Sequence, residues 1–279
     1  MEKKPVFSDL LLQKKFDTDG FVKIPFLNVE EMRALVNCYE RFEVAHSFDE
    51  GGFHHTTHHT KNWRLLEQVN KALLNIFQPK IASFFVNIAT LAANFIIKDN
   101  GADTEFVPHQ DWTLLDEKSY YSFNIWIPLH PVNEKNGAIR ILKGSQNLLR
   151  SIRCAPSFPR VFENVMPHVY ENLTTITFEY GEAVVFDCGV LHGSFPNLSE
   201  QKRVNAIVGL YSNDAQFKFY YNTEQGNPPL IEEYHINPDE FLTFAVGDRP
   251  VGRKPDRIFP YEFPVLTEAQ FLEHYPLKI

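Results

Sequence analysis

The hydrophobic pattern of the chain changes near residue 91, from helical periodicity to short apolar stretches separated by turn residues. The clearest apolar stretches are 91–98, 120–129, 174–178, 183–186 and 204–211. Asn136–Gly137 and Gly144–Ser145 lie between such stretches, and Asn-Gly is a strong hairpin signal. Many short strands with turns between them predict a mainly β protein with a jelly-roll core and flanking helices.

The first 90 residues read as a mostly helical flank. Residues 20–25 form a short strand closed by proline, and Asn28 is placed to cap a following helix. Apolar residues at helical spacing predict a second helix over 63–77, which Pro79 should end, and a third helical stretch follows through Phe84. The proline-rich residues 214–279 should wrap the core with little regular structure. With no repeat or linker, we expect a single domain over 1–279, with its β core at 91–213.

Composition narrows the range of partners and locations. Hydrophobic residues make up 44% of the chain, the net charge is −8, and there is no long Lys/Arg run. We therefore expect a globular protein that binds neither nucleic acid nor an anionic membrane. Cys38, Cys154 and Cys188 are far apart in sequence, the start of the chain lacks an apolar leader, and no apolar run could span a bilayer. These features predict a cytoplasmic protein, whereas oligomeric state cannot be read from the sequence.

The candidate chemistry centres on two histidines and an aspartate. His109 and Asp111 flank Gln110 after an apolar strand, and on one strand their side chains would share a face. His192 follows the strand 183–186. Two imidazoles and one carboxylate form the facial triad that leaves part of an Fe(II) coordination sphere open. A His-x-Asp pair alone is weak evidence, so its position after a strand matters.

Further polar residues are expected near this triad. A loop around Pro196 predicts that the segments holding His192 and Arg203 pair as antiparallel neighbours, so that Arg203 faces the metal. A guanidinium binds a carboxylate through two parallel hydrogen bonds, and would suit a carboxylate-bearing co-substrate. In 121–127, the period of two places Ser122, Asn124 and Trp126 on one face, which suggests a pocket lining.

Several of these segments resemble the phytanoyl-CoA dioxygenase family of Fe(II)/2-oxoglutarate-dependent oxygenases. The matching segments are 19–22 (DGFV), 107–113 (VPHQDWT), 124–129 (NIWIPL), 136–140 (NGAIR), 181–187 (GEAVVFD) and 192–194 (HGS), followed by Arg203. The resemblance implies a double-stranded β-helix core of the cupin-like jelly-roll kind. It covers the chain from about residue 17 to residue 211.

The resemblance also implies a set of roles. His109, Asp111 and His192 would bind Fe(II), and Arg203 and Ser194 would hold the distal carboxylate of 2-oxoglutarate. Trp126 and Asn124 would line the co-substrate side, and Thr113 would approach it. With O2 as the second co-substrate, such an enzyme hydroxylates a C–H bond and releases succinate and CO2. Halogenases of this superfamily replace the carboxylate ligand with a small residue, so Asp111 favours hydroxylation or a related C–H oxidation.

The substrate and two alternative functions stay open. We expect a small organic substrate, and neither a coenzyme A thioester nor a free acid is excluded. The cluster His54, His55, His58 and His59 could bind a second metal or form a lid, although an exposed polar loop is the plainer interpretation. The alternatives are a catalytically silent relative that binds metal and 2-oxoglutarate, and a non-oxygenase metal enzyme of the cupin type.

Overall fold

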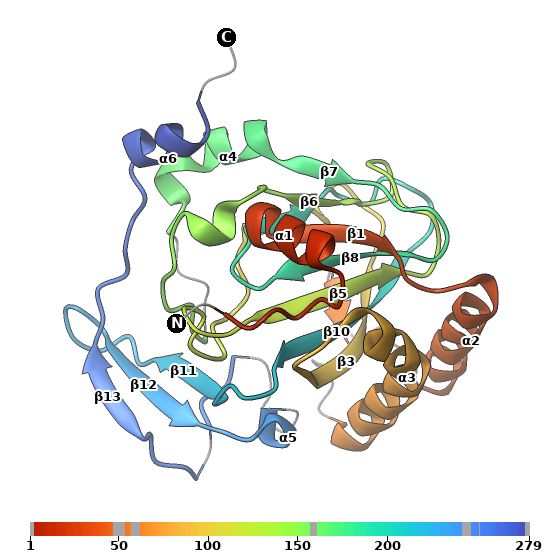
Figure 1. The fold of residues 1–279 in the computed structure, drawn as a ribbon, viewed down its shortest axis with the longest axis horizontal. Helices are drawn as coiled ribbons and strands as arrows, with labels where there is room; N and C mark the ends of the chain where they lie inside the picture. The colour runs from red at the N-terminus through yellow and green to blue at the C-terminus, as the bar shows by residue number, and fades with distance from the viewer. Residues whose placement is uncertain are drawn as a thin grey trace.

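Two antiparallel sheets that face each other form the centre of the molecule (Figure 1). The structure is a computed structural model that describes residues 3–46, 54–56, 62–156, 161–241, 247–250 and 252–276. Its elements are, in chain order, α1 (Leu10–Asp19), β1 (Phe21–Pro25), α2 (Val29–His46), β2 (His54–Thr56), α3 (Trp63–Phe84), β3 (Ile88–Lys98), β4 (Phe106–His109), β5 (Ser122–Pro128), β6 (Ile139–Ile141), α4 (Met166–Asn172), β7 (Thr174–Ile176), β8 (Glu182–Asp187), β9 (His192–Ser194), β10 (Arg203–Ser212), β11 (Lys218–Asn222), β12 (Leu230–His235), α5 (Pro238–Phe241), β13 (Arg257–Pro260) and α6 (Glu268–His274).

The described strands form one six-stranded sheet in the order β1-β8-β5-β10-β3-β2 and one four-stranded sheet in the order β4-β9-β6-β7. The two sheets pack on each other through one buried hydrophobic cluster. It includes Trp126, Val184 and Phe186 from the larger sheet and Ile139, Ile141 and Ile176 from the smaller one. The predicted fold class, mainly β with flanking helices and a jelly-roll core, is confirmed.

Helices α2 and α3 cover the outer face of the six-stranded sheet (Figure 1). Asn28 caps α2 as predicted: its Oδ1 accepts hydrogen bonds from the backbone N–H of Glu30 and Glu31, both at 2.9 Å. Glu31 accepts from the Asn28 N–H at 2.8 Å, which completes a capping box. The cluster beneath the helices places Phe77 of α3 together with Phe95 of β3. Residues of β3 at the alternate positions are therefore left to face the other sheet.

The prediction that Pro79 ends the second helix is wrong, because α3 runs unbroken from Trp63 to Phe84. Proline removes one helical hydrogen bond and normally kinks or breaks a helix. Here Pro79 itself is exposed, while Phe77 and Ile81 on either side are both buried against the sheet. Burial of these apolar side chains offsets the lost hydrogen bond.

The expected pairing of the segments that hold His192 and Arg203 is also wrong. β9 pairs with β4 and β6 in the smaller sheet, whereas β10 pairs with β3 and β5 in the larger one. The segment around Pro196 therefore crosses between sheets instead of closing a hairpin. The same is true of Asn136–Gly137, which lies between β5 of one sheet and β6 of the other. Because β5 and β6, and likewise β9 and β10, lie in opposite sheets, the turn residues between them do not join paired strands.

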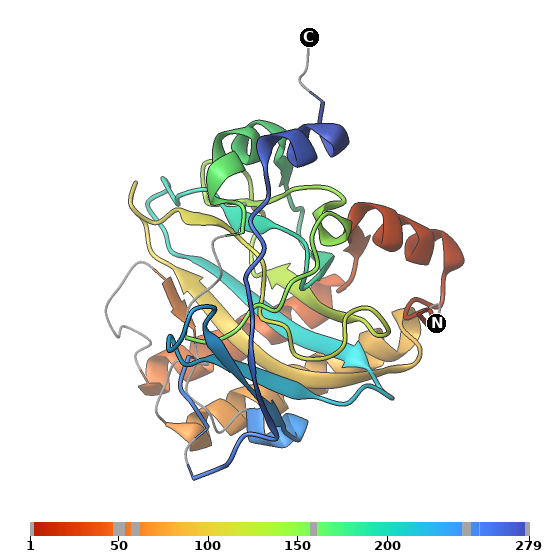
Figure 2. The same cartoon turned by 90° about the vertical axis from the view of Figure 1, so that its left-hand side faces the viewer.

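The C-terminal region contains more regular structure than expected. Within the described residues, β11, β12 and β13 form a three-stranded antiparallel sheet, and α6 packs near α4. Figures 1 and 2 show this small sheet at one end of the sandwich and the α4–α6 pair at the other. Of the histidine cluster, His54 and His55 begin β2, and His58 and His59 lie outside the described residues. No helix in the described part is both long and apolar enough to cross a bilayer.

Candidate active site

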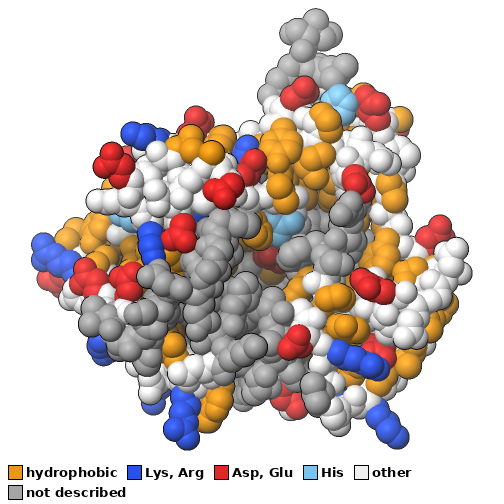
Figure 3. Space-filling model, turned by 180° about the vertical axis from the view of Figure 1, so that it is seen from behind, with side chains coloured by type: hydrophobic (Ala, Val, Ile, Leu, Met, Phe, Trp, Pro, Cys, Tyr) orange, Lys and Arg blue, Asp and Glu red, His pale blue; other side chains and the backbone are white. Residues whose placement is uncertain are grey.

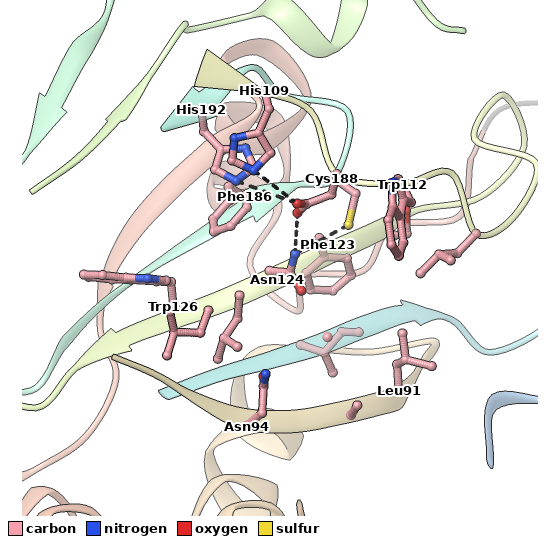
Figure 4. A pocket seen from close by; sticks show the side chains of 18 of the residues that line it. Leu91, Asn94, His109, Trp112, Phe123, Asn124, Trp126, Phe186, Cys188 and His192 are labelled. Carbon is pink, nitrogen blue, oxygen red and sulfur yellow. Dashed lines mark hydrogen bonds and ion pairs between the residues drawn. The ribbon is translucent and has the colours of Figure 1, made fainter. Parts of the chain in front are cut away.

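The three candidate metal ligands meet where β4 and β9 pair. His109 is the last residue of β4 and lies directly opposite His192, the first residue of β9. Their ring centroids are 4.5 Å apart. Asp111 Oδ1 is 3.8 Å from His109 Nε2 and 3.9 Å from His192 Nε2, and the three ligand atoms lie within 4.8 Å of one another (Figure 4). Two nitrogens and one oxygen on one side of a common point suit a divalent metal such as Fe(II) and leave its other positions open.

The structure fixes the orientation of all three side chains. The Nδ1 of His109 is 3.0 Å from the carbonyl oxygen of Val107, and the Nδ1 of His192 is 3.0 Å from that of Val190. A proton on Nδ1 satisfies each carbonyl, so each Nε2 presents its lone pair to the site. Asn124 Nδ2 donates to Asp111 Oδ2 at 2.8 Å, which leaves Oδ1 toward the histidines. The donor set therefore fits a metal without rearrangement of these bonds.

A buried ion pair holds the backbone at Asp111. Arg153 donates from Nε to the carbonyl oxygen of Asp111, and from Nη1 to Glu117 Oε2 at 2.8 Å, while Nη2 donates to Glu117 Oε1. The side chains of Arg153 and Glu117 are only 2% and 9% exposed. Burial acts to lower the pKa of Arg153, but the charge and the hydrogen bonds of Glu117, together with the nearby Asp187, raise it overall. The Asp111 N–H donates to the carbonyl oxygen of Cys188 at 2.9 Å, so this segment is held on both sides.

Arg203 lies in the same cavity as the triad. It is 3% exposed and its guanidinium sits over the Trp126 ring, 5.1 Å from the centroid. Nη1 donates to the Gly137 carbonyl at 2.6 Å and Nη2 to Asn205 Oδ1 at 3.3 Å, while Nε has no hydrogen-bond partner. None of the described carboxylates forms an ion pair with Arg203. A buried charge in this state is suited to an anionic ligand, because an unpaired buried ion is costly.

Lys98 is a buried basic residue in this region that was not predicted from the sequence. It closes β3 opposite Arg203 and is 0% exposed. Its Nζ donates to Ser194 Oγ at 2.6 Å and to the Phe195 carbonyl at 2.8 Å. Burial, with the nearby charge of Arg203, lowers the pKa of Lys98 to about 6. Because Ser194 accepts from Lys98, its own hydroxyl proton can be donated into the cavity. The sequence does contain a signal for this residue, because Lys98 is a lysine at the end of an otherwise apolar strand.

The triad and Arg203 line one cavity of about 460 Å³ between the two sheets. On the face shown in Figure 3, a histidine and an acidic side chain are visible at the bottom of a hollow. Of the predicted residues, the cavity brings together His109, Asp111, Asn124, Trp126, His192, Ser194 and Arg203.

Thr113 is not among the lining residues, contrary to expectation. Its hydroxyl donates to the Ser151 carbonyl at 3.3 Å and accepts from the Arg153 N–H at 3.1 Å, so it serves the neighbouring segment. Trp112 and Phe217 also line the cavity.

Comparison with known proteins gives one family. A family model described as "Phytanoyl-CoA dioxygenase (PhyH)" matches residues 16–205. The rice protein "Phytanoyl-CoA dioxygenase 1" (Oryza sativa subsp. japonica) is 26% identical over 134 residues, which are 46% of this chain and 48% of the rice protein. The chain thus spans about half the length of this curated relative.

Two solved structures share the fold over most of the chain. The α-ketoglutarate-dependent carbocyclase SnoK from nogalamycin biosynthesis has a TM-score of 0.56 at 17% identity, and covers 78% of this chain and 89% of its own. The epimerase SnoN, solved with Fe3+, α-ketoglutarate and nogalamycin RO, has a TM-score of 0.53 at 15% identity, with 94% and 97% covered. At these identities the likeness shows the fold alone. From the family model, which matches more than half of the sequence, the chain belongs to the phytanoyl-CoA dioxygenase family.

Proposed function

We propose that the protein is an Fe(II)/2-oxoglutarate-dependent dioxygenase that hydroxylates a C–H bond of a small organic substrate. The observation that carries this proposal is the position of Arg203. A buried guanidinium without a carboxylate partner lines the same cavity as an oriented His-Asp-His triad. An acid that reaches both groups must carry a carboxylate at one end and metal-binding oxygens at the other, which describes 2-oxoglutarate.

Each residue then has a defined task. His109, Asp111 and His192 would hold Fe(II), and Asn124 would keep Asp111 turned toward it. Arg203 and Ser194 would hold the distal carboxylate, with Lys98 behind Ser194 and Trp126 against the guanidinium. When bound, iron and 2-oxoglutarate supply the O2-dependent oxidation, with succinate and CO2 as products. The protein supplies orientation and a cavity with few polar groups, which limits the access of water.

The candidate metal ligands and the structurally similar proteins both bear on the type of reaction. Asp111 occupies the carboxylate position, which supports hydroxylation over halogenation. SnoK and SnoN are a carbocyclase and an epimerase, so the shared fold alone does not select hydroxylation. In the described residues Cys38, Cys154 and Cys188 are free and buried, which supports our proposal of a reducing, cytoplasmic location.

The experiment is an aerobic assay of succinate release from 2-oxoglutarate with added Fe(II). We expect slow succinate formation by the wild type and none by His192→Ala, because only two protein ligands would remain. His274→Ala, which alters an exposed histidine on α6, is the matched control and should behave as the wild type. Tight metal binding without any succinate would contradict the proposal.

A further inference from the structure

The cavity has two chemically different halves on either side of Asp111. Along its floor, Trp126 of β5 lies opposite Ile207 of β10, Asn124 opposite Gly209, and Ser122 opposite Tyr211. Trp126 marks the end that holds Arg203, and Asn124 lies under Asp111. Ser122 and Tyr211 therefore mark the other end, beyond the candidate metal site. Figure 4 shows Trp112 and Leu91 on that side, opposite Trp126.

The walls of this second half are apolar and aromatic. Trp112, Leu114, Tyr211 and Phe217 line the cavity there and belong to one hydrophobic cluster, which extends to the C-terminal sheet through Phe219 and Tyr234. The Tyr211 and Phe217 rings pack edge to face with centroids 5.4 Å apart. The cluster therefore supplies a rigid wall whose rings can contact an apolar ligand.

The two halves of the cavity also differ in the charge of their lining side chains. Among the described lining residues, the Asp and Arg side chains are Asp111 and Arg203 alone, and no lysine or glutamate lines the cavity. Asn94 points into the cavity in Figure 4 but pairs with Ile207 of β10, so it lies at the Trp126 end. The second half instead presents the neutral hydroxyl of Ser122. A carboxylate, phosphate or ammonium placed here would be desolvated without an opposite charge.

Gly209 opens space on the floor between the two halves. It interrupts the strand β10, where apolar and branched residues otherwise dominate, and glycine inside a strand often marks a close approach of a ligand. A Cβ added at Gly209 would lie 3.4 Å from Asn124 Oδ1 and 3.5 Å from Leu91 Cβ, which are ordinary contacts. Alanine therefore fits at this position, whereas a larger side chain would project into the cavity beside Asp111.

We propose that the substrate is an uncharged, largely apolar small molecule that lies over Gly209 against Trp112, Tyr211 and Phe217, with Ser122 as a hydrogen-bonding partner. Acids, amines and coenzyme A thioesters are disfavoured in this half of the cavity. The inference rests on the proposed function, because it takes the Arg203 half for 2-oxoglutarate.

The test compares three probes that share one ring system. The full-length protein, with Fe(II) and saturating 2-oxoglutarate under anaerobic conditions, is dialysed against 2-naphthol, 2-naphthoate or 2-naphthylmethylammonium. Palmitoyl-CoA serves as the thioester probe. We expect 2-naphthol to bind at least about tenfold more tightly than either charged analogue, since each charge would be buried unpaired. No measurable binding of 2-naphthol, or equal binding of an ion or of palmitoyl-CoA, would overturn the proposal.

Variants at Gly209 locate the bound probe. Gly209→Leu should weaken 2-naphthol binding about tenfold or more while the visible iron–oxoglutarate band persists, and Gly209→Ala should change binding little. If Gly209→Leu fails to fold, Leu91→Phe fills the same space from β3. Unchanged binding in a folded filling variant would overturn the placement. A wild type that binds 2-naphthol but shows no band would instead overturn the proposed function, so the two failures are distinguishable.

Discussion

Arg203 carries a buried positive charge that no described carboxylate neutralises. Its replacement by methionine removes that charge and keeps much of the volume. We expect Arg203→Met to raise the Kd of 2-oxoglutarate roughly 10- to 100-fold, because the ligand carboxylate loses a charge-assisted hydrogen-bonded partner. The melting temperature without ligand should stay equal or rise, since a buried unpaired ion is removed. Calorimetric titration and a thermal melt measure the two effects, and a large loss of stability with unchanged affinity would show a structural role.

Most of the polar residues that line the cavity can be predicted from the sequence, because they lie at recognisable positions relative to the strands. His109, Asp111, His192 and Arg203 are polar residues at or just beyond strand ends, and the alternation in β5 predicts a shared face for Ser122, Asn124 and Trp126. The partnership of Asn124 with Asp111 could not be predicted, because it joins β5 of the larger sheet to the segment that follows β4 of the smaller one. Thr113 follows the motif directly in sequence, yet its hydroxyl is used by the segment around Arg153.

At the scale of elements, the Arg153–Glu117 pair joins the segment after β4 to the segment before α4. Glu117→Gln leaves the guanidinium of Arg153 buried without its carboxylate, and should lower the free energy of unfolding by about 3–5 kcal/mol. The double variant Glu117→Gln/Arg153→Met should recover part of this loss, because the buried charge is then removed. Because Arg153 also holds the Asp111 carbonyl, iron affinity should fall in all of these variants.

Urea unfolding measures the change, and the exposed pair Lys4–Asp214 provides the control. Its side chains are 68% and 40% exposed, so solvent screens the pair and Asp214→Asn should leave stability nearly unchanged. A similar effect of Glu117→Gln and Asp214→Asn would contradict the role given to the buried pair.

The positions of helices and strands are easier to predict from the sequence than the pairing of the strands in sheets. Periodicity and capping locate α2 and the core strands, because both are local properties of the sequence. The placement of β9 and β10 in opposite sheets, and of β5 and β6 likewise, depends on how the whole sandwich closes. Pro79 illustrates a related limit, since the packing of α3 on the sheet outweighs a local helix-breaking signal.

At the scale of the whole molecule, the buried Lys98 makes stability depend on pH. Its pKa falls from 10.5 to about 6 on folding, so folding releases its proton between these pH values. The contribution of Lys98 to stability is therefore lost as the pH falls toward 6 and regained as it rises, with a slope of at most about 1.4 kcal/mol per pH unit. Lys98→Met should remove this slope.

The measurement is the free energy of unfolding of the ligand-free wild type and of Lys98→Met between pH 6 and 9. We expect the wild type to gain stability relative to the variant as the pH rises. A difference that does not change with pH would contradict the assigned proton release.

The general architecture can be predicted from the number of strands and the spacing of turns in the sequence. The C-terminal sheet cannot be predicted in this way. Prolines spread through residues 214–279 suggest irregular chain, yet β11–β13 form a sheet whose residues share a cluster with the cavity wall. Within this wall, Tyr211 and Phe217 lie outside the family match at 16–205, whereas Trp112 and Leu114 lie inside it. Part of the surface that we assign to substrate recognition therefore comes from a region that the family motifs do not cover.

The most direct measurement is an anaerobic titration of the metal-free protein with Fe(II) and then 2-oxoglutarate, followed by visible absorption. A charge-transfer band that appears with both additions, and is lost in His192→Ala, is the result predicted for an iron–oxoglutarate site on this triad. Bound iron without a band would contradict the account and favour a non-oxygenase metal enzyme of the cupin type. Failure to bind iron would contradict the site itself.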